Sequence, residues 1–196
     1  MRLFIAIELP QETKSRIQAL AQDLFSSMPD SKKALRWVPS DQYHLTLKFL
    51  GERPTESVTP LKAALEPVAK SQRPFDLQFQ GIGSFESRKL IRAIWLGIDQ
   101  GAESTVRLAS EIEEACKALG IAKDVRSYTP HLTLARTKEP FPALGLRNAI
   151  SPRTMTAIEP VTITKLSLIQ SVLSHEGPRY KTLQEFPFQS AGVQER

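Results

Sequence analysis

Apolar runs and periodic apolar positions alternate over the first fifty residues, and they predict a strand, a helix and a second strand. Residues 3–7 form a continuous apolar run typical of a buried strand, and Pro10 suits the first turn of a helix. The apolar positions of that helix recur at helical spacing and are Ile17, Leu20, Ala21, Leu24 and Phe25. Residues 43–50 then alternate in polarity, so we predict a strand with one polar face that ends at Gly51.

The stretch that follows has a weaker helical pattern and then becomes extended. A stripe of four apolar positions predicts a helix over residues 57–70, and Pro67 is expected to end or kink this helix. Residues 75–85 return to extended character. We therefore expect one helix and one strand between the polar-faced strand and the middle of the chain.

The second half of the chain repeats this order of elements. Residues 92–98 are a second apolar strand, and the amphipathic helix after them is closed by Gly120, which suits a left-handed cap. A second polar-faced strand then starts at His131. Counted from the start of the apolar strand, the polar-faced strand begins after 41 residues in the first half and after 39 in the second. This near-equal spacing indicates an internal duplication.

The remaining pattern completes an α+β fold. Residues 140–160 are rich in proline and predict a long connection, and residues 161–171 predict a final alternating strand that balances the extended segment of the first half. The chain lacks the glycine pattern of parallel βαβ units, so we predict two sheets that face a central cleft. We expect one bilobal domain over residues 1–196, with lobes formed by residues 1–90 and 91–196. The duplication would place the two polar-faced strands opposite each other.

Both polar-faced strands begin with the same word, His-Leu-Thr-Leu. Alternation places His44 with Thr46 on one face of the first strand, and His131 with Thr133 on one face of the second. Each imidazole transfers protons near neutral pH, and each hydroxyl can donate a hydrogen bond to a phosphate oxygen. One imidazole can activate water while the other protonates the leaving ribose oxygen, with Arg136 as a further donor. Two such pairs predict a phosphodiester site that requires no metal.

The alternatives to this interpretation are a structural duplication and other classes of protein. A single His-x-Thr is weak support for catalysis, because strands are rich in threonine and a lone histidine is usually structural. Here the chain has three histidines, and two of them occupy matching points of the duplication. A duplication without catalysis and a non-catalytic binding protein remain open. A metal-dependent hydrolase is disfavoured, because few candidate ligands occur at the usual spacings.

Composition places the chain among ordinary globular proteins. Its 196 residues are 41% hydrophobic, and its net charge of +5 favours anionic ligands without singling out nucleic acid. No apolar run approaches the ~20 residues that span a bilayer, and the run at residues 3–7 is too short for a secretory leader, so we expect no membrane association. The single cysteine, Cys116, excludes an internal disulfide and gives no zinc cluster. A reducing, cytoplasmic location fits best.

Several other residues invite a functional interpretation that we discount. Cys116 lies on the apolar stripe of its helix and is expected in the core. Trp95 is also assigned to the core, whereas Trp37 is left open between core packing and base stacking. His175 lies in a turn-like sequence and is expected to be exposed.

Five short sequence motifs are distributed over nearly the whole chain. They are RLFIAIELP at residues 2–10, HLTLKFLGE at 44–52, WLG at 95–97, PHLTLAR at 130–136 and GPRY at 177–180. On these words the chain resembles the 2H phosphoesterases. Within them it is similar to the bacterial and archaeal RNA 2′,3′-cyclic phosphodiesterases once described as 2′-5′ RNA ligases.

The resemblance implies a fold and an activity. The fold would be bilobal, with two antiparallel sheets related by a pseudo-two-fold axis around a central cleft and helices outside. The activity would be hydrolysis of an RNA 2′,3′-cyclic phosphate end, for example on a tRNA fragment, to a 2′-phosphate with a free 3′-OH. No metal or other cofactor would take part, and we expect a monomer. The reverse reaction, 2′-5′ RNA ligation, is an alternative, but opening a strained ring in water should be downhill.

The resemblance also implies roles for single residues. His44 would be the proton donor and His131 the proton acceptor, an assignment that the residue types alone do not make. The residues that would bind the phosphate are Thr46, Thr133 and Arg136. Tyr128, which stands where the family usually has Phe, is added as a base or ribose contact. Arg126 is added as a substrate contact on its positive charge and not on the resemblance.

Overall fold

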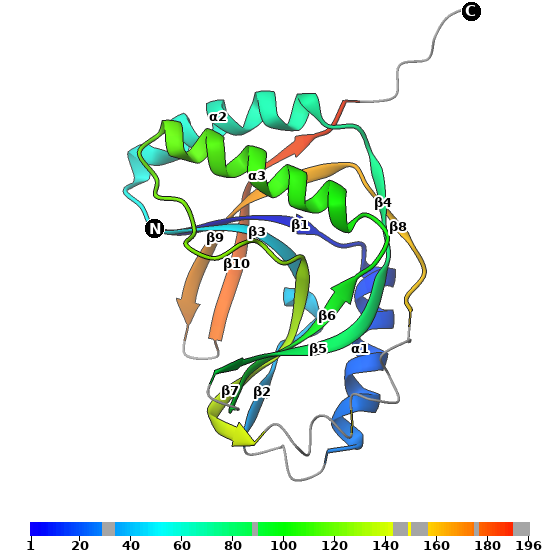
Figure 1. Cartoon of the computed structure of the whole chain (residues 1–196). Helices are drawn as coiled ribbons and strands as arrows, with labels where there is room; N and C mark the ends of the chain where they lie inside the picture. The colour runs from blue at the N-terminus through cyan, green and yellow to red at the C-terminus, as the bar shows by residue number, and fades with distance from the viewer. Residues whose placement is uncertain (29–33, 88–89, 143–148, 150–156, 175–176, 190–196) are drawn as a thin grey trace, which may run out of the picture.

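The computed structural model describes residues 1–28, 34–87, 90–142, 149, 157–174 and 177–189. Within these ranges, two four-stranded antiparallel sheets form two lobes with helices on the outside (Figure 1). The first sheet has the strand order β10-β9-β1-β3 and the second has the order β2-β7-β6-β5. A two-stranded ribbon of β4 and β8 lies beside them. This arrangement confirms the predicted α+β bilobal fold.

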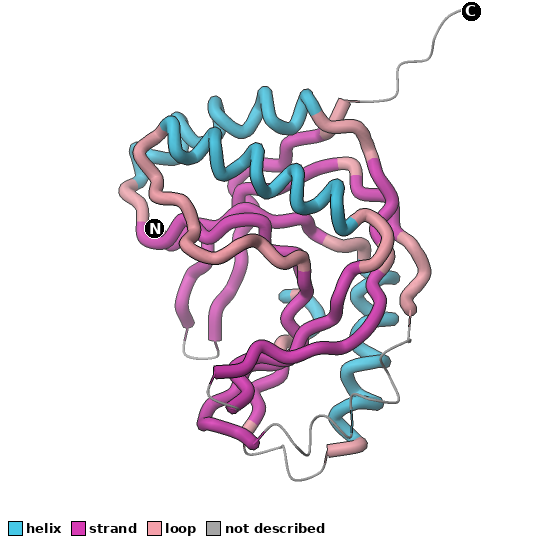
Figure 2. The backbone as a smooth tube through the Cα atoms, viewed as in Figure 1, coloured by secondary structure: helices cyan, strands magenta, loops and turns pink. Residues whose placement is uncertain are grey.

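The elements have the following bounds. The first sheet contains β1 (Arg2–Glu8), β3 (His44–Glu52), β9 (Lys165–Ser174) and β10 (Gly177–Pro187). The second sheet contains β2 (Leu35–Trp37), β5 (Phe79–Ser87), β6 (Leu90–Ile98) and β7 (His131–Pro142), and the ribbon pairs β4 (Phe75–Leu77) with β8 (Val161–Ile163). The helices are α1 (Gln11–Ser26), α2 (Val58–Ser71) and α3 (Ala102–Ala118). Helices α2 and α3 lie beside the first sheet, and α1 lies beside the second (Figure 2).

Each sheet takes strands from both halves of the chain. β1 and β3 share a sheet with β9 and β10, and β2 crosses to pair with β7. The predicted lobes of residues 1–90 and 91–196 are therefore wrong as a division between the sheets. Periodicity reports which face of a strand is buried, but it does not report which strand lies beside it. One cluster of buried side chains includes members of both sheets, and on this ground we propose that residues 1–196 are one domain.

β1 is buried on both faces, which explains its continuous apolar run. The odd-numbered residues of β1 join the main core, whereas Phe4 and Ala6 pack with Ile169 in a separate small cluster. Successive residues of a strand point to opposite faces, so this small cluster lies on the cleft side of the first sheet. The strand thus supports the core and the floor of the cleft at once.

β3 continues past the glycine at which we predicted its end. Gly51 lies inside the strand with a φ of 74°. Leu3 pairs with Gly51 while Phe4 pairs with Phe49, which leaves one extra residue in β3. Glycine adopts a positive φ at little cost, so a bulge forms at this point without ending the pairing.

Two further predictions are corrected by the structure. α2 runs through Pro67 to Ser71, so the helix does not end at this proline, and a kink there stays a prediction. Residues 161–171 are not the final strand, since they divide between β8 and β9 and β10 follows. The expected balance with the first half is confirmed for β8, which pairs with β4. Most of the predicted connection over residues 140–160 lies outside the described residues, as does His175.

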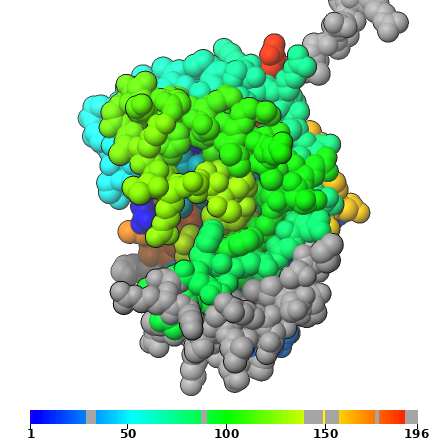
Figure 3. Space-filling view, viewed as in Figure 1, coloured from blue at the N-terminus to red at the C-terminus, as the bar shows by residue number. Residues whose placement is uncertain are grey.

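Helices α2 and α3 lie against each other at the top of the molecule (Figures 1 and 3). Cys116 of α3 is only 1% exposed, which confirms its predicted place in the core. Burial raises the pKa of its thiol to about 11, so the reactive thiolate is disfavoured. Within the described ranges, no helix is long and apolar enough to cross a bilayer.

Candidate active site

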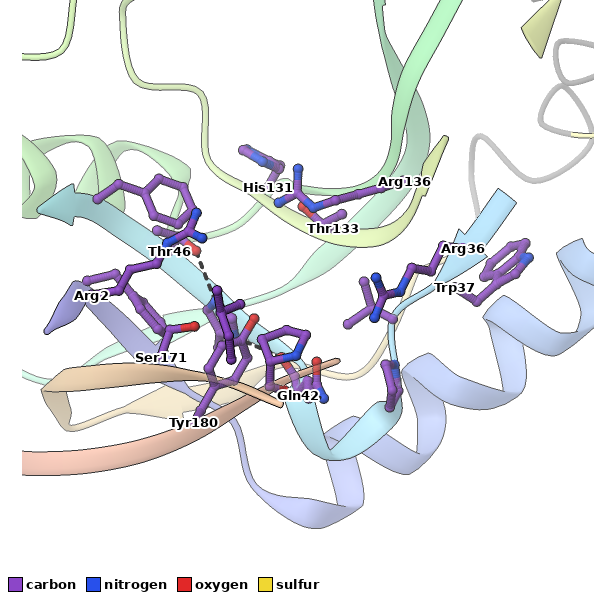
Figure 4. A pocket seen from close by; sticks show the side chains of 17 residues that line it. Arg2, Arg36, Trp37, Gln42, Thr46, His131, Thr133, Arg136, Ser171 and Tyr180 are labelled. Carbon is purple, nitrogen blue, oxygen red and sulfur yellow. Dashed lines mark hydrogen bonds between the residues drawn. The ribbon is translucent and has the colours of Figure 1, made fainter. Parts of the chain in front are cut away.

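A pocket of about 640 Å³ is lined by side chains of both sheets (Figure 4). β3 supplies His44 and Thr46, and β7 supplies His131, Thr133 and Arg136. The fold therefore brings five of the residues predicted from the sequence to one place. Their chemical roles stay predictions. The pocket also contains residues that the sequence did not indicate as site residues, including Arg2, Phe4, Arg36, Gln42, Ser171 and Tyr180.

A bulge in β7 brings Arg136 to the pocket. Thr133 and Ala135 pair with consecutive residues of β6, which leaves Leu134 as an extra residue. Strict alternation would point residue 136 away from the face that holds Thr133. The bulge shifts the alternation by one place, so the Arg136 side chain returns to the cleft face.

β3 has the same bulge at the same point of its motif. Thr46 and Lys48 pair with consecutive residues of β1, so Leu47 is the extra residue. The shifted alternation points Phe49 into the pocket and buries Lys48 toward α3. The matching bulges support the predicted pseudo-two-fold relation between the two strands.

The His44 imidazole has a defined orientation and tautomer. Its Nδ1 lies 2.7 Å from the Gln42 carbonyl oxygen, which can only accept, so Nδ1 carries the proton. Nε2 therefore accepts a hydrogen bond from the Thr46 hydroxyl at 3.0 Å. The ring centroids of Phe4 and Tyr180 lie 4.9 and 5.2 Å from the imidazole centroid. Burial in these surroundings lowers the pKa of His44 to about 4, so the free protein holds it neutral at pH 7.

His131 has the same arrangement in a more open setting. Its Nδ1 lies 2.7 Å from the Thr129 carbonyl oxygen, again two residues upstream, which leaves Nε2 unprotonated. Burial lowers the pKa of His131, and the nearby positive charge of Arg136 lowers it further. Both imidazoles are therefore neutral in the free protein at pH 7, and both have Nε2 as the proton acceptor.

Among the described residues, the arginines that line the pocket are Arg2, Arg36 and Arg136 (Figure 4). All of them are exposed to solvent. A guanidinium group suits phosphate because it can donate two parallel hydrogen bonds. Arg36 escaped the sequence analysis because β2 has only three residues and no readable alternation. Arg2 could have been found from strand alternation, since it lies two residues before Phe4 and therefore on the same cleft face of β1.

Arg126 and Tyr128 do not line this pocket, and their roles as substrate contacts stay predictions. Arg126 is exposed in the segment between α3 and β7. The Tyr128 hydroxyl donates to the Thr46 carbonyl oxygen at 3.0 Å, and burial raises the pKa of the phenol so that it stays a donor. Through this hydrogen bond, Tyr128 links the segment that precedes β7 to β3.

Lys48 fixes the beginning of the segment between α3 and β7. Its side chain is fully buried, and its Nζ donates to Glu113 Oε1 at 2.6 Å and to the Ala122 carbonyl oxygen at 3.3 Å. With Tyr128 at the far end, the segment that leads into β7 is attached to β3 twice. β3 and β7 belong to different sheets, so these contacts help to set the distance between the two histidines.

Replacing Tyr128 by Phe is expected to lower the free energy of unfolding by about 1 kcal/mol, the usual worth of one hydrogen bond. The kcat for a cyclic phosphate substrate should fall by about tenfold, because the start of β7 is held less firmly and small displacements are costly in catalysis. Urea unfolding and initial rates measure the two effects. A variant with lower stability and an unchanged kcat would show that this hydrogen bond does not position the site.

Neither tryptophan is fully buried in the core. Trp95, predicted to be a core residue, is half-buried on the cleft face of β6 opposite Thr133, because that face of the second sheet is open to the cleft. Its ring centroid lies 6.5 Å from that of His131. Trp37 lines the pocket and packs edge-on against Phe25 at 5.5 Å.

Comparison with known proteins decides the family. The sequence pattern of the 2′-5′ RNA ligase superfamily matches residues 5–173, which include both His-Leu-Thr-Leu strands. The chain belongs to the 2′-5′ RNA ligase superfamily. This membership confirms the resemblance to the 2H phosphoesterases that the five sequence words indicated.

Individual proteins of known name also match almost the whole chain. A Geobacillus stearothermophilus protein named RNA 2′,3′-cyclic phosphodiesterase is 32% identical over 96% of this chain, which spans 57% of the length of that relative. A Methanocaldococcus jannaschii protein of the same name is 32% identical over 95% of this chain and 100% of its own length. The crystal structure of E. coli LigT complexed with 3′-AMP has a TM-score of 0.73 and 27% identity, over 95% of this chain and 97% of that chain.

Proposed function

We propose that this protein hydrolyses the 2′,3′-cyclic phosphodiester at the end of an RNA and leaves a 2′-phosphate with a free 3′-OH. The observation that carries the proposal is the convergence of two His-x-Thr pairs from different sheets on one pocket. The arginines of the pocket favour an anionic substrate. The shared name of the two relatives, RNA 2′,3′-cyclic phosphodiesterase, gives the substrate class.

In the proposed mechanism His131 is the base and His44 is the acid. Nε2 of His131 takes a proton from water, the water oxygen bonds to phosphorus, and the bond from phosphorus to the 3′ oxygen breaks. His44 gives its Nε2 proton to the departing 3′ oxygen. Negative charge grows on the phosphoryl oxygens in the transition state, and the groups that stabilise it are Thr46, Thr133 and Arg136.

The acid role of His44 requires a proton that the free protein does not hold at pH 7. A bound cyclic phosphate carries a negative charge, and an opposite charge nearby raises the pKa of an imidazole. Substrate binding therefore favours protonation of His44. The Thr46 hydroxyl, which donates to Nε2 in the free protein, then becomes available to a phosphate oxygen.

The pH dependence of kcat/KM is expected to be bell-shaped, with its maximum below pH 6.5. This parameter reports the free protein, in which the pKa of His44 is about 4 and the pKa of His131 is lowered from 6.5. At lower pH both imidazoles are protonated, and at higher pH both are neutral, so the acid–base pair is lost on each side. The maximum of kcat should lie at higher pH, because bound phosphate raises both pKa values. Initial rates with a cyclic mononucleotide check this, and a kcat/KM maximum above about pH 7 would contradict it.

The test of the proposed function is a short RNA ending in 2′,3′-cyclic phosphate, incubated with the protein in EDTA. The expected product carries a 2′-phosphate, which ³¹P NMR distinguishes from a 3′-phosphate. Binding without turnover would favour a non-catalytic RNA-end binding protein. Turnover that EDTA abolishes would favour a metal-dependent hydrolase, and joining to an added 5′-OH RNA would reveal 2′-5′ ligation.

The finer parts of this function are also proposals. We propose that tRNA fragments are among the substrates, and that the protein works as a monomer in the cytoplasm. The support for the location is the single cysteine, which suits a reducing compartment. Analytical ultracentrifugation measures the oligomeric state.

A further inference from the structure

The cleft face of the second sheet continues beyond the phosphate site. Trp95 pairs directly with Thr133 on one side and with Gly83 on the other. Directly paired residues of an antiparallel sheet share a face, so these three positions form one row across the cleft side. A nucleic acid held by the motif of β7 would lie next to this row.

The indole of Trp95 lies close against the backbone of β5. A Cβ atom added at Gly83 would lie 2.3 Å from the indole, which no side chain tolerates. Gly83 therefore allows the indole to pack low on the sheet instead of projecting into the cleft. The result is a flat aromatic surface where a larger residue at position 83 would have forced the ring outward.

Phe85 lies on the same face of β5, two residues further along. Its ring centroid is 5.6 Å from that of Trp95 and 4.8 Å from that of His131, with the imidazole perpendicular to it. Phe85 is nevertheless 37% exposed. An exposed aromatic ring, supported from one side by an indole and adjacent to His131, is a feature that the proposed hydrolysis does not use.

The position of Phe85 relative to the pocket indicates which nucleotide would contact it. The pocket has room for more than a phosphoryl group, and Phe4 and Tyr180 line it around His44 on the first sheet. That wall suits the ribose and base of the terminal nucleotide. Phe85 and Trp95 are not among the pocket residues and stand on the opposite sheet, so a base there belongs to a neighbouring nucleotide.

We propose that Phe85, supported by Trp95, is a stacking platform for the base of the nucleotide that precedes the cyclic end. This inference rests on the proposed function, since it names a second subsite for the same RNA. Stacking on an aromatic ring is tolerant of base identity, because every base has a π face. The platform thus favours chains of two or more nucleotides over cyclic mononucleotides, without selecting a sequence.

The test compares kcat/KM for a cyclic mononucleotide and for a dinucleotide that ends in 2′,3′-cyclic phosphate. The wild type should prefer the dinucleotide, and Phe85→Leu should reduce that preference by about 5- to 150-fold, the range expected for one stacked base. Leucine keeps an apolar contact on His131 but removes the π face, and Phe85→Tyr should retain the preference. A Phe85→Leu variant that slows both substrates equally would overturn the proposal, because Phe85 would then act only by supporting His131.

A binding measurement separates this inference from the proposed activity. The chain has two tryptophans, so Trp37→Phe leaves Trp95 as the only indole. In that variant a dinucleotide with a 3′-phosphate should change the fluorescence emission of Trp95. It should also bind more tightly than a mononucleotide with a 3′-phosphate, whether or not the protein is an enzyme. Phe85→Leu in the same background should weaken dinucleotide binding. An emission that responds equally to both nucleotides, or to neither, would exclude the platform.

Discussion

Replacing His44 or His131 by Ala is expected to lower kcat on a cyclic phosphate substrate by roughly 10²–10⁴-fold, the usual contribution of a positioned acid or base. Each Nε2 has its proton state set by a backbone carbonyl at Nδ1, and alanine removes the imidazole with no other titratable group in its place. Single-turnover rates at saturating substrate measure the loss. The matched control is His175→Ala, which removes the third histidine of the chain. Residual activity above about a tenth of wild type in either site variant would contradict the two-histidine mechanism.

The effect of His44 on folding is measured by the pH dependence of the free energy of unfolding. The pKa of His44 is about 4 in the folded protein and 6.5 when unfolded, so the unfolded chain binds a proton that the folded chain rejects. The wild type is therefore expected to lose stability as pH falls from 6.5 toward 4, by up to about 3 kcal/mol from this residue. His44→Ala should remove that part of the acid sensitivity. Urea unfolding at several pH values measures both.

Replacing Lys48 by Met is expected to lower the free energy of unfolding by about 3–5 kcal/mol, as when one partner of a buried ion pair is removed. The Lys48 side chain has no exposed surface, and the Glu113 side chain is 18% exposed. Methionine fills the space but leaves the Glu113 carboxylate without its counter-charge. The kcat should fall as well, because the segment before β7 loses its attachment to β3.

The variants that accompany Lys48→Met identify the cause. Lys48→Met with Glu113→Gln should regain much of the stability, because a neutral amide does not need a buried counter-charge, and urea unfolding of the full cycle gives the coupling energy. Lys165→Met is the matched control, since Lys165 pairs with Glu185 at 2.6 Å on the surface and should contribute less than about 1 kcal/mol. Equal losses of unfolding free energy in the Lys48→Met and Lys165→Met variants would show that burial does not make the Lys48 ion pair more important than a surface pair.

Most of the site could be predicted from the sequence because its residues occur in one repeated word. Strand alternation places the two His-x-Thr pairs on defined faces, and the structure brings these faces together. Alternation alone misplaces Arg136, which returns to the pocket through the bulge at Leu134. Its closeness to the second motif in the sequence and the family resemblance both indicated Arg136, whereas periodicity could not, since a bulge leaves no trace in the apolar pattern. Tyr128 was predicted as a substrate contact, and what the sequence did not indicate is its hydrogen bond to the Thr46 carbonyl oxygen.

The parts of the fold that escaped prediction are strands without an apolar face of readable length. β10 exposes most of its side chains, so its eleven residues show no alternation. β2 has three residues, and with it Arg36 was missed as a pocket residue. β2 forms because β7, about 100 residues later in the chain, supplies its hydrogen bonds, and this information is not local. β10 forms a hairpin with β9, the strand just before it.

The order of strands in the first sheet has a consequence for synthesis. β1 carries part of the pocket wall, yet its partner β9 comes about 160 residues later in the chain. A nascent chain emerges from its amino end, so the sheet that holds His44 stays incomplete until residues 165–187 have left the ribosome. A chain that stops between residues 137 and 164 therefore carries both histidine motifs without an assembled active site, and activity requires the hairpin of β9 and β10.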